Sequence, residues 1–175
     1  MPVDIKPSIS NLSNELKHKI LTVISVFETG RKVFDYGKLT ILPDAPNSQK
    51  QITWGKLQTT QSSGLKQLLQ KYDLKAGRKI DFGKYLSIAN KLELVNDEHF
   101  LQLLNESAKD PIMQQTQDEF FDSYYFAPAK KWALQNGFTL PLSMLVILDS
   151  FIHSGGMRNF LINRFSEERP INGGN

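Results

Sequence analysis

The chain contains no cysteine among its 175 residues, which excludes disulfide staples, thiol catalysis and thiolate-bound metal sites. It also has no apolar run near the roughly 20 residues that a membrane-spanning helix needs, because the longest, residues 142–148, is interrupted by Ser143. The first residues show no basic head followed by an apolar stretch and a small-residue cleavage site. We therefore expect neither a membrane partner nor a secretory signal in this sequence.

Strong charge of one sign is absent as well. The net charge is +3, and the basic residues do not gather into runs, so nucleic acid is not expected as a partner. The three histidines, His18, His99 and His153, lie far apart in the sequence and lack the spacing of a metal site. We expect no metal and no other cofactor.

The first half of the chain changes its hydrophobic period once. Apolar residues recur every three or four positions over residues 12–29, which predicts a helix capped by Ser10 or Asn11 and stopped by Gly30. Residues 36–42 and 51–58 are rich in β-formers and flank a turn-forming cluster. This pattern predicts a β-hairpin with Asp44 at its tip.

After Gly64 the pattern is helical. The expected helices cover residues 65–72, 82–89, 98–107, 111–124, 128–136, 140–153 and, as a last turn or two, 158–165. Residues 140–153 are apolar almost all round, which is typical of a central buried helix. The fold class is α+β and mostly α: one domain over residues 1–175, with a small hairpin or sheet after the first helix.

Glu28 and Asp44 are the candidate catalytic residues. Glycoside hydrolysis needs two carboxyl groups on opposite sides of one sugar linkage. Glu28 sits at the negative end of a helix dipole beside Phe27, and both factors disfavour its anion, so we expect a raised pKa and a role as general acid. Asp44, on a polar turn, is expected to stay ionised. The alternative is a solvated helix-end glutamate and an ordinary turn aspartate.

A resemblance to a known family runs over roughly residues 15–165. It rests on residues 26–30 (VFETG), 36–44 (YGKLTILPD), 52–55 (ITWG), 110–118 (DPIMQQTQD), 125–129, 145–149 and the glycine pair 155–156. In order and spacing these segments resemble the chitosanases of glycoside hydrolase family 46. The resemblance implies a lysozyme-like fold of two lobes with a sugar cleft between them.

The resemblance also implies roles for the two carboxyl groups. Glu28 matches the general acid and Asp44 the general base of an inverting reaction, in which the carboxyl groups lie about 6.5–9.5 Å apart. The family places a water-positioning hydroxyl on the hairpin arm, where this chain has Gln49, Gln51 and Thr53. The family's glycine-rich turn is replaced here, so the water-holding residue stays open among these three.

Further residues are candidates for binding substrate. Gln51, Thr53, Gln58 and Thr59 are expected to line the cleft and bind sugar hydroxyls or acetamides, although strand-end polar residues explain them equally.

Outside the hairpin, Tyr125 is a candidate for stacking on a sugar ring, with a place in the core as its alternative. Arg31 follows Glu28 by three residues, where it can reach either carboxylate; its alternative is a solvated turn residue. Asp149, within an apolar helix, needs a partner, for which we expect Arg31 or Arg158.

The substrate expected from the sequence is an amino-sugar polymer with β-1,4 bonds. Peptidoglycan is placed slightly ahead of chitosan, because the net charge is positive and residues 61–64 hold no acid where the family has one. Chitosan is the alternative polymer. A non-catalytic glycan-binding module on the same fold is the alternative class of function.

The chain also stops earlier than the chitosanases do, so it is either a minimal domain or a fragment of a longer protein. It then fits a phage lysin or the toxic domain of a secreted effector, acting on the cell wall, in the periplasm or outside the cell. For a toxin, we expect an immunity protein that plugs the cleft.

Overall fold

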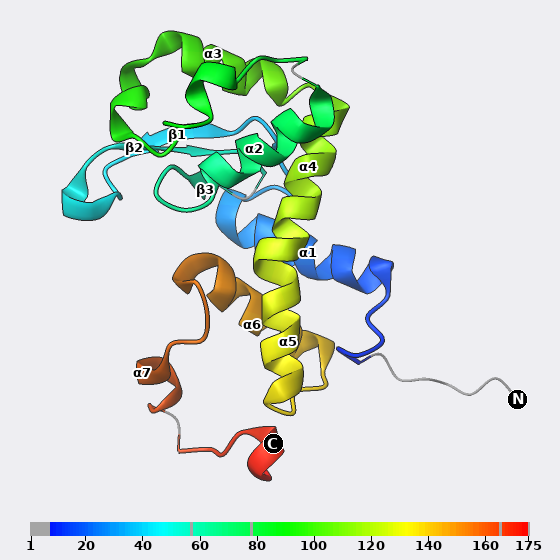
Figure 1. Ribbon diagram of the computed structural model, residues 1–175. Coiled ribbons are helices and arrows are strands. Elements are labelled where there is room, and N and C mark those ends of the chain that lie inside the picture. Colours follow the sequence, from blue (N-terminus) through cyan, green and yellow to red (C-terminus); the bar gives the residue numbers. More distant parts are fainter. Residues whose placement is uncertain (1–7, 57, 78, 165, 175) are drawn as a thin grey trace, which may run out of the picture. The chain divides into compact units, whose positions relative to one another are not determined.

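The computed structural model describes residues 8–56, 58–77, 79–164 and 166–174. They form two compact units, drawn together in Figure 1. The helical unit consists of residues 8–33 and 122–174, and the sheet unit consists of residues 34–121. Each unit is built around its own elements. No helix of the described residues is long and apolar enough to cross a bilayer.

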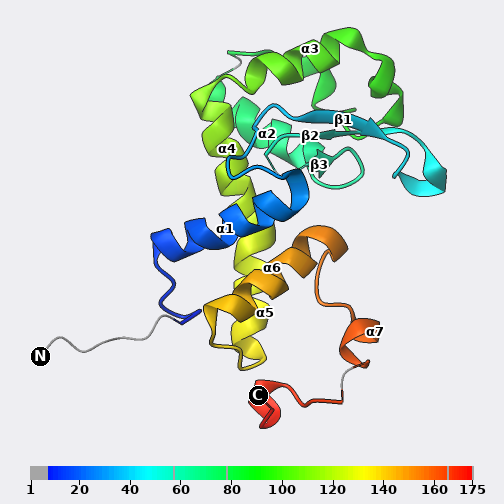
Figure 2. The ribbon, with the colours of Figure 1, turned by 180° about the vertical axis from the view of Figure 1, so that it is seen from behind.

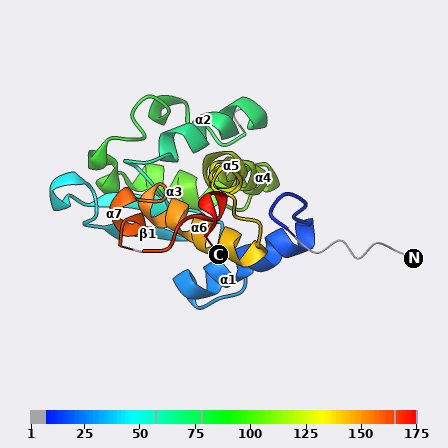
Figure 3. The ribbon, with the colours of Figure 1, turned by 90° about the horizontal axis from the view of Figure 1, so that it is seen from below.

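The helical unit is organised around α6. Its elements are α1 (Asn14–Thr29), the π-helical turn η4 (Asp122–Phe126), α5 (Ala127–Gln135), α6 (Pro141–Ser154), α7 (Asn159–Ile162) and the short η5 (Pro170–Asn172). Helix α6 contacts α1 and α5, as Figure 2 shows, and Figure 3 looks along α5 nearly end-on. The buried apolar residues here include Ile20, Ile24, Ala129, Ala133, Met144, Ile147 and Leu148.

Helix α1 begins later than expected. Ser13 is the N-cap, and its hydroxyl accepts a hydrogen bond from the backbone N–H of Leu16. The predicted cap was wrong because the Asn11 side chain accepts instead from Ser8, in the turn before the helix. The predicted stop is confirmed: Gly30 adopts a left-handed φ of 69°, which glycine tolerates without a steric cost.

The expectation that the helix over residues 140–153 is buried all round was wrong. One stripe of α6 is buried, whereas Leu142 and Val146 are exposed at 70% and 60%. Phe27 of α1, assigned to the apolar stripe of that helix, is 82% exposed. Helix α6 contacts α1, α5 and η4, and one stripe of it is buried while another remains exposed. The expected last turn is α7; Phe165, at the end of its predicted range, lies outside the described residues.

The sheet unit contains an antiparallel sheet in the order β1-β2-β3. The strands are β1 (Leu39–Leu42), β2 (Gln51–Trp54) and β3 (Thr59–Thr60), with the short η1 (Pro46–Ser48) in the first connection. Leu42 is opposite Gln51 at one end of the β1–β2 pair, and Leu39 is opposite Trp54 at the other. The predicted hairpin is confirmed, and β3 extends it to three strands. Together with the helices, this is the α+β, mostly α class that the sequence predicted.

Three helices and two 3-10 segments complete the sheet unit. They are α2 (Leu65–Ala76), η2 (Gly83–Tyr85), η3 (Leu92–Asn96), α3 (Glu98–Ser107) and α4 (Pro111–Phe121). The core packs these elements against the inward face of β2, from which Ile52 and Trp54 are fully buried. The helix expected over residues 82–89 is absent: the Asp81 side chain accepts from the Gly83 backbone and starts a turn there.

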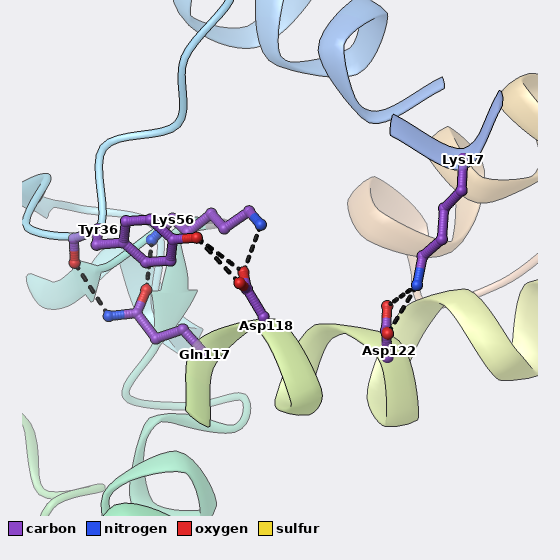
Figure 4. A network of polar contacts seen from close by, with 6 residues as sticks. All are labelled: Lys17, Tyr36, Lys56, Gln117, Asp118 and Asp122. Atoms are coloured by element: carbon purple, nitrogen blue, oxygen red, sulfur yellow. Dashed lines mark hydrogen bonds and ion pairs between the residues drawn. The ribbon is translucent and has the colours of Figure 1, made fainter. Parts of the chain in front are cut away.

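Polar side chains fix α4 within the sheet unit (Figure 4). The Gln117 amide accepts from the backbone N–H of Lys56 and donates to the carbonyl of Tyr36. Asp118 accepts from the Tyr36 hydroxyl and pairs with Lys56. Burial first, and then the Asp118 charge, raise the pKa of Tyr36 to about 12, so its phenol remains a donor.

A separate ion pair, also drawn in Figure 4, lies within the helical unit. Lys17 of α1 donates to both carboxylate oxygens of Asp122 in η4, over 2.6 and 2.7 Å. The same ammonium group lies 4.5 Å from the centre of the Phe126 ring. The contact ties α1 to η4, which are far apart in the sequence.

Candidate active site

Glu28 lies on the last turn of α1 and lines a hollow of the helical unit. Its side chain is 17% exposed, and the last turn of the helix holds no basic residue. The hollow has a volume of about 430 Å³. It is lined by residues of α1 (Ile24, Phe27 and Glu28) and of α6 (Leu145, Val146, Asp149 and His153). A partly buried carboxyl group thus borders an open space with a largely apolar lining.

His153 joins the two carboxylates of this hollow. Its Nε2 lies 3.4 Å from Glu28 Oε1 and 3.4 Å from Asp149 Oδ1. Asp149 and His153 are four residues apart on α6 and therefore share one face of the helix. The prediction that Asp149 pairs with Arg31 or Arg158 was wrong, because among the described residues Asp149 pairs with His153. The i, i+4 spacing of these two residues is visible in the sequence and is the signal that could have found the pair.

Tyr125 belongs to the surroundings of Glu28. Burial first, then the neighbouring Tyr124 and the charge of Glu28, raise the pKa of Tyr125 to about 12. The rings of Tyr124 and Tyr125 meet edge to face, with centroids 5.0 Å apart. Tyr125 is therefore a neutral hydrogen-bond donor near the candidate acid, half-buried rather than part of a sealed core. Its stacking on a sugar stays a prediction.

Asp44 lies in the sheet unit, on the exposed loop that follows β1. The backbone N–H of Ala45 donates to the carbonyl of Gln49 and closes this loop. The Gln51 amide donates a hydrogen bond to Asp44 Oδ1 over 3.0 Å. Among the described residues, Oδ2 of Asp44 receives no hydrogen bond. One carboxylate oxygen is anchored, and the other is available to a water molecule.

Gln51 and Thr53 point to the same face of β2, because side chains alternate along a strand. Gln51 is 2% exposed, and its carbonyl oxygen accepts from the backbone N–H of Ser62. Because this position is buried, Gln51 has almost no surface for the direct contact with substrate that was predicted for it. Thr53 is buried too, and its hydroxyl makes no hydrogen bond within the described residues. A role for Thr53 in holding water stays a prediction.

Gln58 and Thr59 take the structural positions that were their alternative as strand-end polar residues, and a contact of either with substrate stays a prediction. The Gln58 amide donates to the carbonyls of Lys38 and Gly55 and accepts from Thr40, so it holds the turn between β2 and β3. Thr59 is 5% exposed and pairs with Trp54 in the sheet. The two residues are engaged in this way because the sheet has a third strand. The turn between β2 and β3 needs side chains that hold it, and the predicted two-stranded hairpin had no such turn.

Arg31 follows the Gly30 cap of α1. Its backbone carbonyl accepts from the Ser25 hydroxyl, which fixes the chain as it leaves the helix, and its side chain is exposed. Its role toward substrate stays a prediction. As for metals, no group of three or more histidine or carboxylate side chains within the described residues is arranged so that it could hold a metal ion.

Comparison with known proteins identifies the fold. No protein-family model matches the chain, and no curated protein does. Solved structures do match: a GH46 chitosanase of Gynuella sunshinyii, GsCsn46A, in complex with chitotetraose, has a TM-score of 0.79 and 22% identity, over 94% of this chain and 72% of that one. The native chitosanase of Bacillus subtilis MY002 has a TM-score of 0.79 and 24% identity, over 94% and 73%.

A glutamate-to-alanine mutant of the MY002 chitosanase, complexed with 6 GlcN, has a TM-score of 0.80 and 23% identity, over 94% of this chain and 73% of that one. These likenesses show that the chain has the fold of the GH46 chitosanases. The expected fold is confirmed.

Proposed function

We propose that this protein is an inverting endo-glycoside hydrolase that cleaves the β-1,4 bonds of chitosan. The observation that carries the proposal is the position of Glu28: a partly buried carboxyl group at a helix C-terminus, bordering an open hollow. Its fold, shared with chitosanases, supports the same class of reaction. Asp44, with one oxygen anchored and one open, supplies the second carboxyl group.

The reaction assigns one proton to each carboxyl group. Glu28 gives its proton to the glycosidic oxygen as the C1–O bond breaks, and the leaving sugar departs with a hydroxyl group. A water molecule attacks C1 from the opposite face and transfers a proton to Asp44. The products are two shorter chains, and the new reducing end has inverted configuration. Asp44 then releases its proton to solvent and Glu28 regains one, so the reaction consumes only water.

The preference for peptidoglycan over chitosan is not supported, and chitosan replaces it. The solved structures of the same fold are chitosanases, two of them in complex with chitotetraose and with 6 GlcN. The net charge averages over the whole chain and does not report the charge at the hollow. Besides the candidate acid Glu28, Asp149 lines the hollow, and its carboxylate suits the ammonium groups of glucosamine.

We expect the enzyme to act on its polymer substrate at the cell wall, in the periplasm or outside the cell, and this localisation stays a prediction. An immunity protein, expected for a toxin, has no supporting observation among the described residues of either unit. It stays a prediction from the sequence.

Parallel digestion tests the proposal. The wild type, Glu28→Gln and Asp44→Asn are incubated with chitosan and with purified peptidoglycan, and new reducing ends are counted. We expect the wild type to cleave chitosan and each variant to lose about 10²- to 10⁴-fold in kcat. Glu106→Gln, an exposed change of the same kind on α3, serves as the control and keeps full activity. Binding of chitosan without cleavage by the wild type identifies a glycan-binding module instead.

A further inference from the structure

The side chain of Gln51 spans two segments of the sheet unit. Its Nε2 donates to Asp44 Oδ1 over 3.0 Å, and its Oε1 accepts from the backbone N–H of Ser62 over 3.1 Å. The residue is 2% exposed. A buried amide with both ends engaged has one accessible orientation, because turning it over sets its oxygen against the carboxylate and its NH₂ against an N–H.

The segments on either side of Gln51 are themselves held by backbone contacts. Gln51 is opposite Leu42 in the β1–β2 pair, and Leu42 lies two residues before Asp44 in the sequence. The backbone of Gln61 donates to the carbonyl of Ile52, and the Gln61 side chain accepts from the Ile52 N–H in return. Ser62 is therefore registered to β2 at the same end of the sheet. The hydrogen bond from the Gln51 amide therefore fixes the Asp44 carboxylate, which lies on an exposed loop, to this end of the sheet.

We propose that Gln51 is the positioning residue of the catalytic base: it anchors Asp44 Oδ1 and thereby directs Oδ2 at the attacking water. The inference rests on the proposed function. A general base must be held within hydrogen-bond reach of its water, and a displacement near 1 Å costs on the order of 100-fold in rate. A neutral donor suits this task, because it orients the carboxylate and leaves its negative charge in place. A lysine or arginine would neutralise that charge.

Two substitutions separate positioning from a purely structural role. Gln51→Ala removes the donor, and we expect kcat on chitosan to fall about 10- to 100-fold while KM changes less than twofold. Gln51→Glu keeps the size and the acceptor for Ser62, but it sets a second carboxyl group against Asp44. Two carboxyl groups in contact share a proton and titrate as a coupled pair. Gln70→Glu, an exposed change of the same charge on α2, is the matched control.

The decisive readout is the carbon-13 titration of the Asp44 side-chain carboxyl, which requires no substrate. We expect one titration step in the wild type and in Gln70→Glu, and two separated steps in Gln51→Glu, with an additional ionisation in its pH–rate profile. A single unchanged step in Gln51→Glu, or an unchanged kcat in Gln51→Ala, overturns the inference. An inactive wild type refutes the proposed function instead, and the titration still decides whether Gln51 contacts Asp44.

Discussion

The imidazole of His153 lies 3.4 Å from the carboxylate of Glu28, at the hollow that both side chains line. The same nitrogen is 3.4 Å from Asp149, and the His153 side chain is 55% exposed. The candidate acid therefore has an ionisable neighbour whose charge depends on protonation. A cation at this position favours the ionised form of Glu28, and an ionised carboxyl group has no proton to give.

A permanent cation in place of His153 is therefore expected to slow the enzyme. His153→Lys sets an ammonium group near Glu28 at every working pH, and we expect kcat on chitosan to fall at least about tenfold. His153→Gln removes the charge and is expected to keep kcat within a few-fold of the wild type. The initial rate of reducing-end release measures both. Equal rates for the two variants contradict an electrostatic link between His153 and Glu28.

Phe27 is expected to contribute to substrate binding. It is 82% exposed and lines the hollow directly beside Glu28, where its ring offers an apolar face to a sugar. Losing about 1–2 kcal/mol of apolar contact in Phe27→Ala raises KM for a glucosamine oligomer about 5- to 30-fold. The thermal midpoint is expected to stay unchanged. Leu74→Ala, equally exposed on α2, is the control, and an unchanged KM in Phe27→Ala argues against the contact.

Asp110 is expected to contribute to the acid sensitivity of the sheet unit. Burial by itself opposes its anion, but the Tyr72 hydroxyl, the Ile112 backbone N–H and Lys79 together lower the pKa of Asp110. A lowered pKa stabilises the fold above the ordinary value near 4, and this contribution is lost as the pH falls through the lowered pKa.

We therefore expect Asp110→Asn to unfold more easily at neutral pH, by about 2 kcal/mol. The difference from the wild type narrows as the pH falls from about 4 through the lowered pKa, because the carboxyl group is protonated first in the unfolded chain and then in the native one. Urea unfolding at several pH values measures this. A difference that stays constant with pH shows that the charge of Asp110 does not matter.

Gly55 is required for a close approach of backbone to side chain. It has a φ of 87°, and a Cβ atom there would lie 2.7 Å from the Gln117 amide oxygen that accepts from Lys56. Gly77 has a φ of 58° and open space where a Cβ would lie. We expect Gly77→Ala to lower the free energy of unfolding by about 1 kcal/mol and Gly55→Ala by at least about 2 kcal/mol. Equal losses contradict the Gln117 contact.

Sequence patterns predicted correctly those helix ends at which the hydrophobic period and a capping residue agree. The helix over residues 98–107 matches α3 at both ends, because Asp97 caps it and accepts from the Phe100 N–H. Gly30 ended α1 as expected. The start of α1 was harder, since three nearby polar residues compete as caps and only the folded turn shows that Asn11 is engaged with Ser8.

Exposure and side-chain contacts were not predictable in the same way. Phe27 and Val146 occupy helical positions typical of a core, yet exposure depends on which neighbours cover a helix, and that is a property of the fold. Gln51 was expected to contact sugar, whereas the strand register places its amide against Asp44. Glu28 and Asp44 were chosen from their positions at a helix end and on a polar turn, and the family resemblance pointed to the same two residues; their catalytic roles remain a prediction.

The configuration of the first product tests the central claim most directly. Proton NMR of the wild type cleaving a glucosamine oligomer, recorded in the first minutes before mutarotation, reports the anomer at the new reducing end. If Glu28 acts as the acid and Asp44 activates a water for attack from the opposite face of the sugar, the α-anomer appears first. A β-anomer in the first spectra, or an intact oligomer, contradicts the account.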